Sequence, residues 1–130
     1  MTLPFEVASI DGAQELYDWF GYWPSFHDAE VVRLELNRSG PSSLSVLTRE
    51  TTGEVDQKGY HVPAKNATVD FMIEGISDLD LNGFSHQNVV NNIEIEKTPN
   101  GFLVTLWPCY GLAGTIDSSK ISIQVSPEKP

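Results

Sequence analysis

Apolar residues recur at every second position in one short segment after another, and this alternation constrains the fold of the 130-residue chain more than any other feature. Successive side chains of a strand point to opposite faces, so the pattern predicts strands with one buried and one solvated face. The segments are joined by turns rather than by helical crossovers, which indicates antiparallel pairing. We expect about seven or eight short strands within residues 29–125.

The alternation also predicts which side chains face the core. The predicted inward residues, strand by strand, are Val32, Leu34 and Leu36; Leu44, Val46 and Thr48; Val69, Phe71 and Ile73; Leu79 and Leu81; and Ile93 and Ile95. Ser39-Gly40-Pro41, Asn82-Gly83 and Thr98–Gly101 are typical of tight turns. The glycine-rich stretch 111–116 predicts a bulge or a close backbone approach.

A different period marks the N-terminal part of the chain. Ala13, Leu16, Trp19 and Phe20 fall at helical spacing, which predicts an amphipathic helix over residues 11–20 with Asp11 as its N-cap. A helix this short is not stable by itself, so it must pack on the sheet. We therefore predict an α+β, mostly β fold, with one strongly curved antiparallel sheet and one N-terminal helix packed on it; a small sandwich is the alternative.

The length fits a single domain spanning residues 1–130. Within it, residues 50–66 are predicted to form a polar loop and residues 126–130 a short C-terminal tail. No run approaches the ~20 apolar residues of a membrane span. No basic residue precedes a hydrophobic stretch at the N-terminus, so we do not expect a signal peptide. We expect a cytoplasmic location instead.

The charge balance limits the kind of partner. Eight Lys and Arg against eighteen Asp and Glu give a formal net charge of −10. Nucleic-acid backbones and anionic membranes both require a positive surface, so neither is an expected partner. A charged partner of this chain would be basic.

Trp23, His27, Asp28 and Glu30 form the densest polar cluster, between the predicted helix and the first strand. Histidine and carboxylates supply both metal ligands and acid–base pairs, so a ligand or metal pocket is one interpretation. The other is structural: His27 and Asp28 are adjacent and point apart on an extended chain. They would then bond to the backbone and fix the corner, with Trp23 and Phe26 anchored in the core. His61 and His86 lie in separate loops.

The sequence carries no catalytic motif: no phosphate-binding glycine loop, no nucleophile elbow and no paired zinc histidines. The single cysteine, Cys109, excludes an internal disulfide or a multi-cysteine metal site. Its flanks are apolar and no cation adjoins it, so it is predicted to be a small buried side chain. No enzyme activity and no cofactor are expected.

Acidic residues concentrate on outward positions of the predicted strands. Such a charged face either is merely solvated or binds a basic partner. Besides Glu35, the candidate partner-binding residues are Asp70, Glu74, Asp78, Asp80, Glu94 and Glu96.

The order of several segments resembles the immunity protein 50 family of bacterial polymorphic toxin systems. The resemblance spans about Leu16 to Val125 and rests on the segments LYDWFGYWPS, VVRLELNRSGPSSLSV, FMIEGISDLDLNGF and NVVNNIEIEKTPNGFLVTL. Phe26–Val31 is more charged than the corresponding stretch of the family. The resemblance implies a β-rich cytosolic domain that neutralises a toxin by binding it.

Three hypotheses of function follow. The first is a non-catalytic immunity protein that binds a cognate protein toxin. The second is a small domain with a ligand or metal site at the His27, Asp28 and Glu30 corner. The third is self-association as a homo-oligomer, through an exposed final strand.

Overall fold

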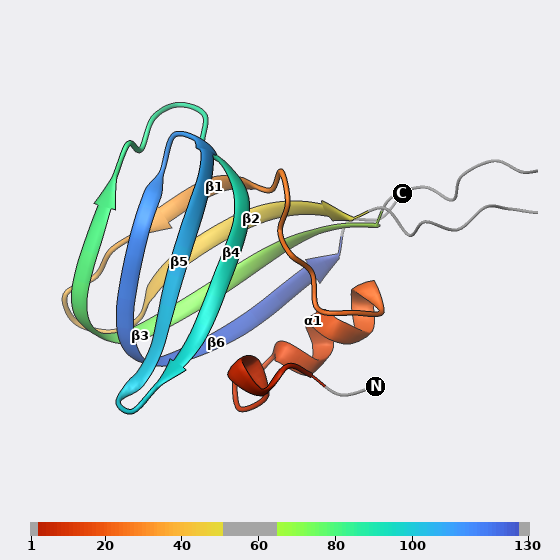
Figure 1. Ribbon diagram of the computed structural model, residues 1–130, viewed down its shortest axis with the longest axis horizontal. Coiled ribbons are helices and arrows are strands. Elements are labelled where there is room, and N and C mark those ends of the chain that lie inside the picture. The colour runs from red at the N-terminus through yellow and green to blue at the C-terminus, as the bar shows by residue number, and fades with distance from the viewer. Residues whose placement is uncertain (1–2, 51–64, 128–130) are drawn as a thin grey trace, which may run out of the picture.

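Six antiparallel strands form one sheet that curves into a closed barrel (Figure 1). The computed structural model describes residues 3–50 and 65–127. The strands are β1 (Glu30–Glu35), β2 (Ser42–Glu50), β3 (Lys65–Asn82), β4 (Val89–Thr98), β5 (Gly101–Tyr110) and β6 (Ala113–Pro127), and the helices are η1 (Phe5–Val7) and α1 (Ala13–Phe20). The sheet order is β1-β2-β3-β6-β5-β4, and the single residue pair Glu30–Val89 joins β1 to β4. The predicted mostly β fold with one curved sheet is confirmed, with six strands rather than seven or eight.

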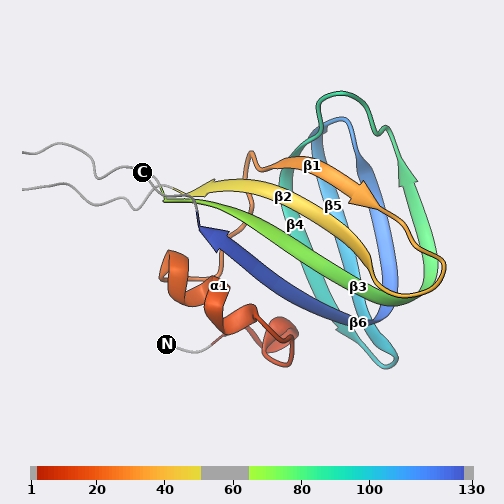
Figure 2. The ribbon, with the colours of Figure 1, turned by 180° about the vertical axis from the view of Figure 1, so that it is seen from behind.

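The strand count is lower because β3 is one continuous strand of 18 residues. It bends sharply at Gly75, whose φ of +67° lies in the left-handed region that glycine favours, and its register with β6 shifts between Ile76 and Asp78. The first half of β3 pairs with β2 and β6, whereas the second half pairs with β6 alone. In Figure 2 the second half leaves β2 at the bend and runs along the rim of the barrel.

Two turn predictions have different outcomes. The Thr98–Gly101 turn joins β4 and β5 as expected. Asn82-Gly83 does not form a two-residue hairpin between β3 and β4, because β3 pairs with β6 and not with β4. Residues 83–88 instead connect β3 to β4. The close approach predicted for the glycine-rich stretch 111–116 is confirmed: a Cβ on Gly114 would lie 1.8 Å from the carbonyl oxygen of Asp80.

The predicted faces hold for most strands, and in β1 they hold for Leu34, which packs against the core, but fail at Val32 and just beyond the strand at Leu36. Val32 and Leu36 are about half exposed, at 51% and 49%, while Val31 is buried. The cause is a register shift against β2 between Val31 and Arg33. One extra residue at such a bulge reverses the alternation of the side chains.

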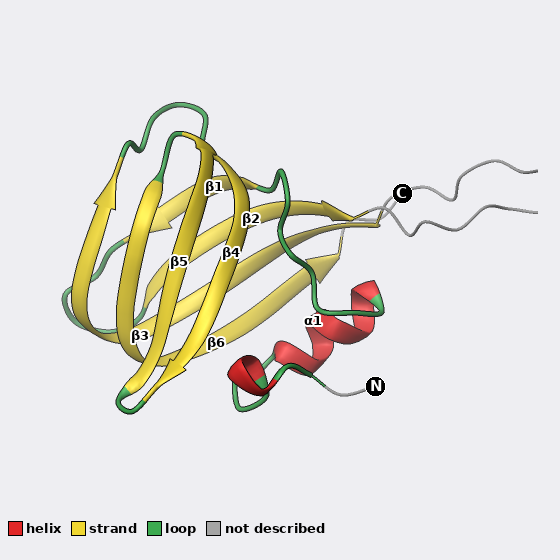
Figure 3. Ribbon diagram, viewed as in Figure 1, coloured by secondary structure: helices red, strands yellow, loops and turns green. Residues whose placement is uncertain are grey.

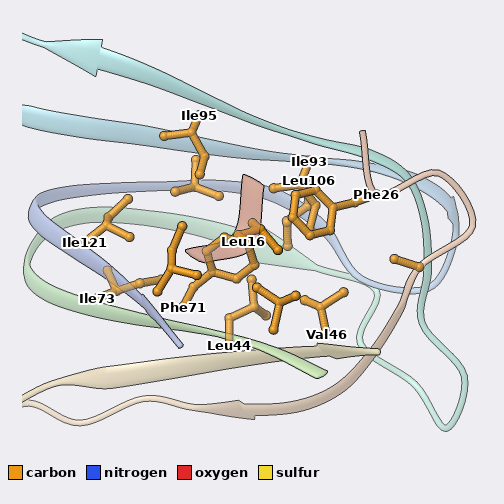
Figure 4. Packing of buried hydrophobic residues seen from close by; sticks show 14 of the residues in the cluster. Leu16, Phe26, Leu44, Val46, Phe71, Ile73, Ile93, Ile95, Leu106 and Ile121 are labelled. Atoms are coloured by element: carbon orange, nitrogen blue, oxygen red, sulfur yellow. The ribbon is translucent and has the colours of Figure 1, made fainter. Parts of the chain in front are cut away.

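The core fills the inside of the barrel (Figure 4). The buried members that were predicted from the alternation are Leu44, Val46, Thr48, Val69, Phe71, Ile73, Ile93 and Ile95. Leu79 and Leu81 are not fully buried, and Leu79 is 39% exposed because it lies beyond the bend of β3.

Helix α1 lies beside the barrel and contacts β6 (Figure 3). It contributes Leu16 to the core (Figure 4). The prediction of Asp11 as N-cap is wrong: Gly12 occupies that position. Asp11 instead accepts a backbone hydrogen bond from Ile123 at 2.7 Å, which fastens the helix to the sheet. Among the described residues, no helix is long and apolar enough to cross a membrane.

The predicted polar loop over residues 50–66 lies for the most part outside the described residues, and the positions at its borders, 50, 65 and 66, belong to strands. The predicted tail begins later than expected, because β6 continues to Pro127.

Candidate functional site

The corner between α1 and β1 is held by backbone hydrogen bonds to β4. The Asp28 amide donates to the Val90 carbonyl and the Val90 amide to the Ala29 carbonyl, both at 2.9 Å. Phe26 and Asp28 take left-handed backbone angles, with φ of 65° and 60°. For residues other than glycine, this conformation persists only where the surrounding structure imposes it.

Phe26 explains why the corner is so tightly fixed. Its side chain is fully buried and meets the Phe71 ring edge-on, with the ring centroids 5.6 Å apart. The Trp23 ring also meets the Phe26 ring edge-on, with the ring centroids 6.4 Å apart. Edge-to-face contacts at these distances stabilise a core beyond simple burial.

The polar side chains of the corner point to solvent. His27 Nδ1 lies 3.2 Å from the Asn91 carbonyl oxygen, and His27 Nε2 lies 3.5 Å from an Asp28 carboxylate oxygen. Their side chains are 62% and 68% exposed. Such an exposed pair is well screened by water and contributes little to stability.

Cys109 lies on the same exposed side, and its Sγ donates to Asp28 Oδ1 at 3.8 Å. The prediction that Cys109 is buried is wrong. Its exposure follows from the register shifts between β4 and β5 near Val89 and Val90, which end the alternation of β5 before Pro108.

The sequence placed Trp23, His27, Asp28 and Glu30 at one pocket, but only Trp23 lines a groove there. That groove, of about 400 Å³, lies between the η1 segment, Trp23–Ser25 and β4. In residues 3–50 and 65–127, no three side chains of the His, Cys, Asp or Glu type are grouped to hold a metal. His86 lies in the 83–88 connection, and His61 is outside the described residues.

The second candidate site is an acidic face on the outside of β4, β5, β6 and the second half of β3. Directly opposed residues on neighbouring strands point to the same side of a sheet. The register therefore gives two outward rows across the four strands, Glu94–Thr105–Thr115–Asp80 and Glu96–Leu103–Asp117–Asp78. We call the carboxylates of these rows the acidic face: Asp78, Asp80, Glu94, Glu96 and Asp117.

The acidic face lacks compensating charge. The three ion pairs found within the described part of the chain are His27–Asp28, Arg33–Glu35 and Lys120–Glu74, and none involves a carboxylate of the face. Such a cluster repels anions and attracts cations over several ångströms.

Two of the six predicted partner-binding residues lie apart from this face. Asp70 is half-buried on the first half of β3 and accepts a hydrogen bond from Ser45. Glu74 sits at the bend of β3, with its carboxylate 3.9 Å from the Lys120 ammonium.

The structure adds Asp117 and Trp107 to the face, and the sequence had not pointed to either. Asp117 lies in a stretch without clear alternation, and its position depends on the long-range pairing with Asp78. Trp107 lies opposite Asn92, two register positions from the Glu94–Thr105 pair and on the same outward side, and is 49% exposed. An exposed tryptophan beside a charged surface is the kind of side chain that anchors protein interfaces.

The chain is thus a mostly β protein with a helix at one side of the barrel and a carboxylate-rich outer surface. The family model described as Immunity protein 50 matches residues 12–127. The chain belongs to the immunity protein 50 family. No curated protein and no solved structure matches the chain.

Proposed function

We propose that this protein neutralises a toxic protein in the cytoplasm by binding it directly, without catalysis. The proposal rests on membership of an immunity protein family across residues 12–127. Immunity by binding needs a complementary surface, and it needs no reacting groups.

We propose the acidic face as the binding surface, and the observation that carries this choice is its uncompensated charge. Five carboxylates share one outward face, and the chain as a whole carries −10. A basic toxin surface, such as one that handles a polyanionic substrate, would be attracted to it from a distance. Trp107 at the end of the face would supply an apolar anchor.

The first experiment is a rescue test in growing cells. Each open reading frame next to this gene is expressed alone and then together with this protein, and growth is scored. Rescue of cells from one toxic neighbour supports the proposal and identifies the partner. The proposal would be contradicted if the toxic protein encoded next to this gene remained fully active in an equimolar mixture with this protein.

Purified components then test the surface. We expect nanomolar affinity or better, corresponding to about −12 kcal/mol, and an association rate that falls as salt is raised. Glu94→Lys with Glu96→Lys should slow association, whereas Glu15→Lys with Asp18→Lys on α1 makes the same charge change away from the face. Equal slowing by both pairs would indicate that net charge, and not this face, drives the encounter.

A ligand site at the His27 corner is the weaker candidate. His27 and Asp28 are exposed and the groove beside Trp23 does not include them. We therefore expect His27→Ala to leave toxin rescue unchanged.

A further inference from the structure

The second half of β3 has one edge without a backbone partner. Pairing of β3 with β2 ends at Ile73, opposite Ser42, whereas pairing with β6 continues to Asn82. Along residues 76–82, no other strand or loop of the described chain forms a backbone hydrogen bond with the remaining edge. We call this stretch the open edge. Unpaired strand edges accept an added strand through main-chain hydrogen bonds.

We propose that an extended segment of the toxin, with basic and apolar residues in alternation, adds to the open edge as a further strand. This inference rests on the proposed function and specifies where and how the toxin is held. The required alternation follows from the two sides of the edge.

The outer side of the open edge is anionic. Asp78 and Asp80 point outward from it, both are exposed, and neither forms an ion pair with a described residue. In an antiparallel pair, directly opposed side chains have Cβ atoms about 4.5–5.5 Å apart. Lysine or arginine on the outward positions of an added strand would therefore reach these carboxylates.

The inner side of the open edge is apolar. Leu79 points toward the barrel interior and stays 39% exposed, because no strand covers it. It lines a cavity of about 500 Å³ together with the apolar side chains of Leu36, Ile73 and Ile76, and Asn37, Arg38, Ser42 and Glu74 form the polar part of the lining. Leu36, the residue that follows β1, is itself 49% exposed across this cavity. Apolar side chains on the inward positions of the added strand would cover the apolar part of this cavity and remove both leucines from water.

A second copy of this chain is a poorer occupant. Antiparallel pairing of two open edges centred on Leu79 would place Asp78 of one copy opposite Asp80 of the other. Like charges directly opposed across strands are destabilising, and each copy carries a net charge of −10. The same two aspartates that favour a basic strand therefore oppose self-pairing.

The direct test uses a synthetic peptide of about seven residues, enough to span the open edge. The probe alternates lysine and valine and has blocked ends, and its binding is followed by NMR with the ¹⁵N-labelled protein. We expect shifts concentrated at residues 76–82, with edge-facing amides there exchanging at least about tenfold more slowly at saturation. A glutamate–valine peptide and a lysine–valine peptide N-methylated on its pairing amides should both fail to bind.

Matched charge reversals separate the edge from the rest of the acidic face. Asp80→Lys is on the open edge, and Glu94→Lys makes the same charge change on β4 in the same outward row. We expect Asp80→Lys to weaken peptide binding by about fivefold or more and Glu94→Lys by clearly less. Urea unfolding tests whether each variant is folded. If the Asp80→Lys variant is not folded, Asp78→Lys takes its place. Equal effects of the edge and β4 variants would overturn the inference.

The toxin found by rescue is then tested in the same way. Strand addition is supported if the amides of residues 76–82 exchange more slowly in the complex. It is also supported if the Asp80→Lys variant binds the toxin more weakly than the Glu94→Lys variant does. A toxin that binds tightly but leaves these amides unprotected overturns this inference and leaves the proposed function standing. If no toxin binds, both fall. If the amides of the open edge become protected from exchange as the concentration of the protein alone is raised, the edge binds a second copy of this chain, and the inference is overturned.

Discussion

Gly114 is a position at which one added methyl group should severely damage the fold. A Cβ there would lie 1.8 Å from the Asp80 carbonyl oxygen, where β6 crosses the second half of β3. Cβ atoms essentially never approach a heavy atom below 3.0 Å. The two strands would therefore have to separate by more than 1 Å, and the hydrogen bonds near Asp80 and Leu81 would be lost or stretched.

The cost of Gly114→Ala has two parts. Its φ of +135° is unfavourable for any residue with a side chain, which costs about 1–2 kcal/mol. Strand separation adds about 1 kcal/mol for each weakened hydrogen bond and about 1–3 kcal/mol of overpacking strain. With one hydrogen bond weakened, the free energy of unfolding should fall by about 3–6 kcal/mol in total.

Gly21→Ala is the matched control, because Gly21 also has a positive φ, of +85°, but nothing lies within 4 Å of its added Cβ. It should cost only about 1 kcal/mol. Urea unfolding of both variants, followed by tryptophan fluorescence, measures the difference. Unfolding free energies within about 0.5 kcal/mol of each other would show that β3 and β6 do not approach as described, and would refute their pairing near Asp80 and Leu81.

Three further measurements test the core, the β1 turn and the acidic face. Phe26→Ala should lower the free energy of unfolding by about 3–5 kcal/mol, since Phe26 is fully buried, whereas Phe84→Ala, at a ring 57% exposed, should change it by at most about 0.5 kcal/mol. The Asn37 hydrogen bond, and then the Arg33 charge, hold the pKa of Glu35 below its usual range, so NMR titration of Asn37→Ala should show that pKa raised. Because folding lowers this pKa, the contribution of Glu35 to stability is present above the unfolded-state value and is lost as the pH falls through the folded-state value. Trp107→Ala should leave stability within about 0.5 kcal/mol and weaken toxin binding by about tenfold or more; unchanged binding would remove Trp107 from the proposed surface.

Local pattern was sufficient to predict the helix and most of the core. Leu44, Val46, Phe71 and Ile93 face inward because their strands are regular over those positions. In β1 the alternation gave the correct face for Leu34 but not for Val32, because the extra residue between Val31 and Arg33 turns Val31 inward instead. The bulge cannot be predicted from the sequence here, because Val31 and Val32 are adjacent valines and either register places an apolar side chain inward.

Pairing over long distances in the sequence could not be predicted, and the candidate site depends on it. Asn82-Gly83 favours a hairpin between neighbouring segments, yet β3 pairs with β6, more than thirty positions later in the chain. That pairing brings Asp117 beside Asp78 and leaves the open edge on the other side. The family resemblance could be seen from the order of segments alone, whereas the arrangement of the carboxylates required the register.

The pairing of Asp78 with Asp117 gives a means of separating folding from function. Two carboxylates directly opposed across strands repel one another, which costs the folded state about 0.2–1 kcal/mol. Replacing one by its neutral isostere, Asp117→Asn, should therefore raise the free energy of unfolding by a similar amount, as measured by urea unfolding. The same change removes one negative charge from the acidic face, so toxin association should slow at low salt. Opposite signs for the two effects would mean that the repulsion is retained for binding at the expense of stability. A loss of both stability and affinity would mean instead that Asp117 supports the local structure of β6, and the acidic face would then lose its central carboxylate.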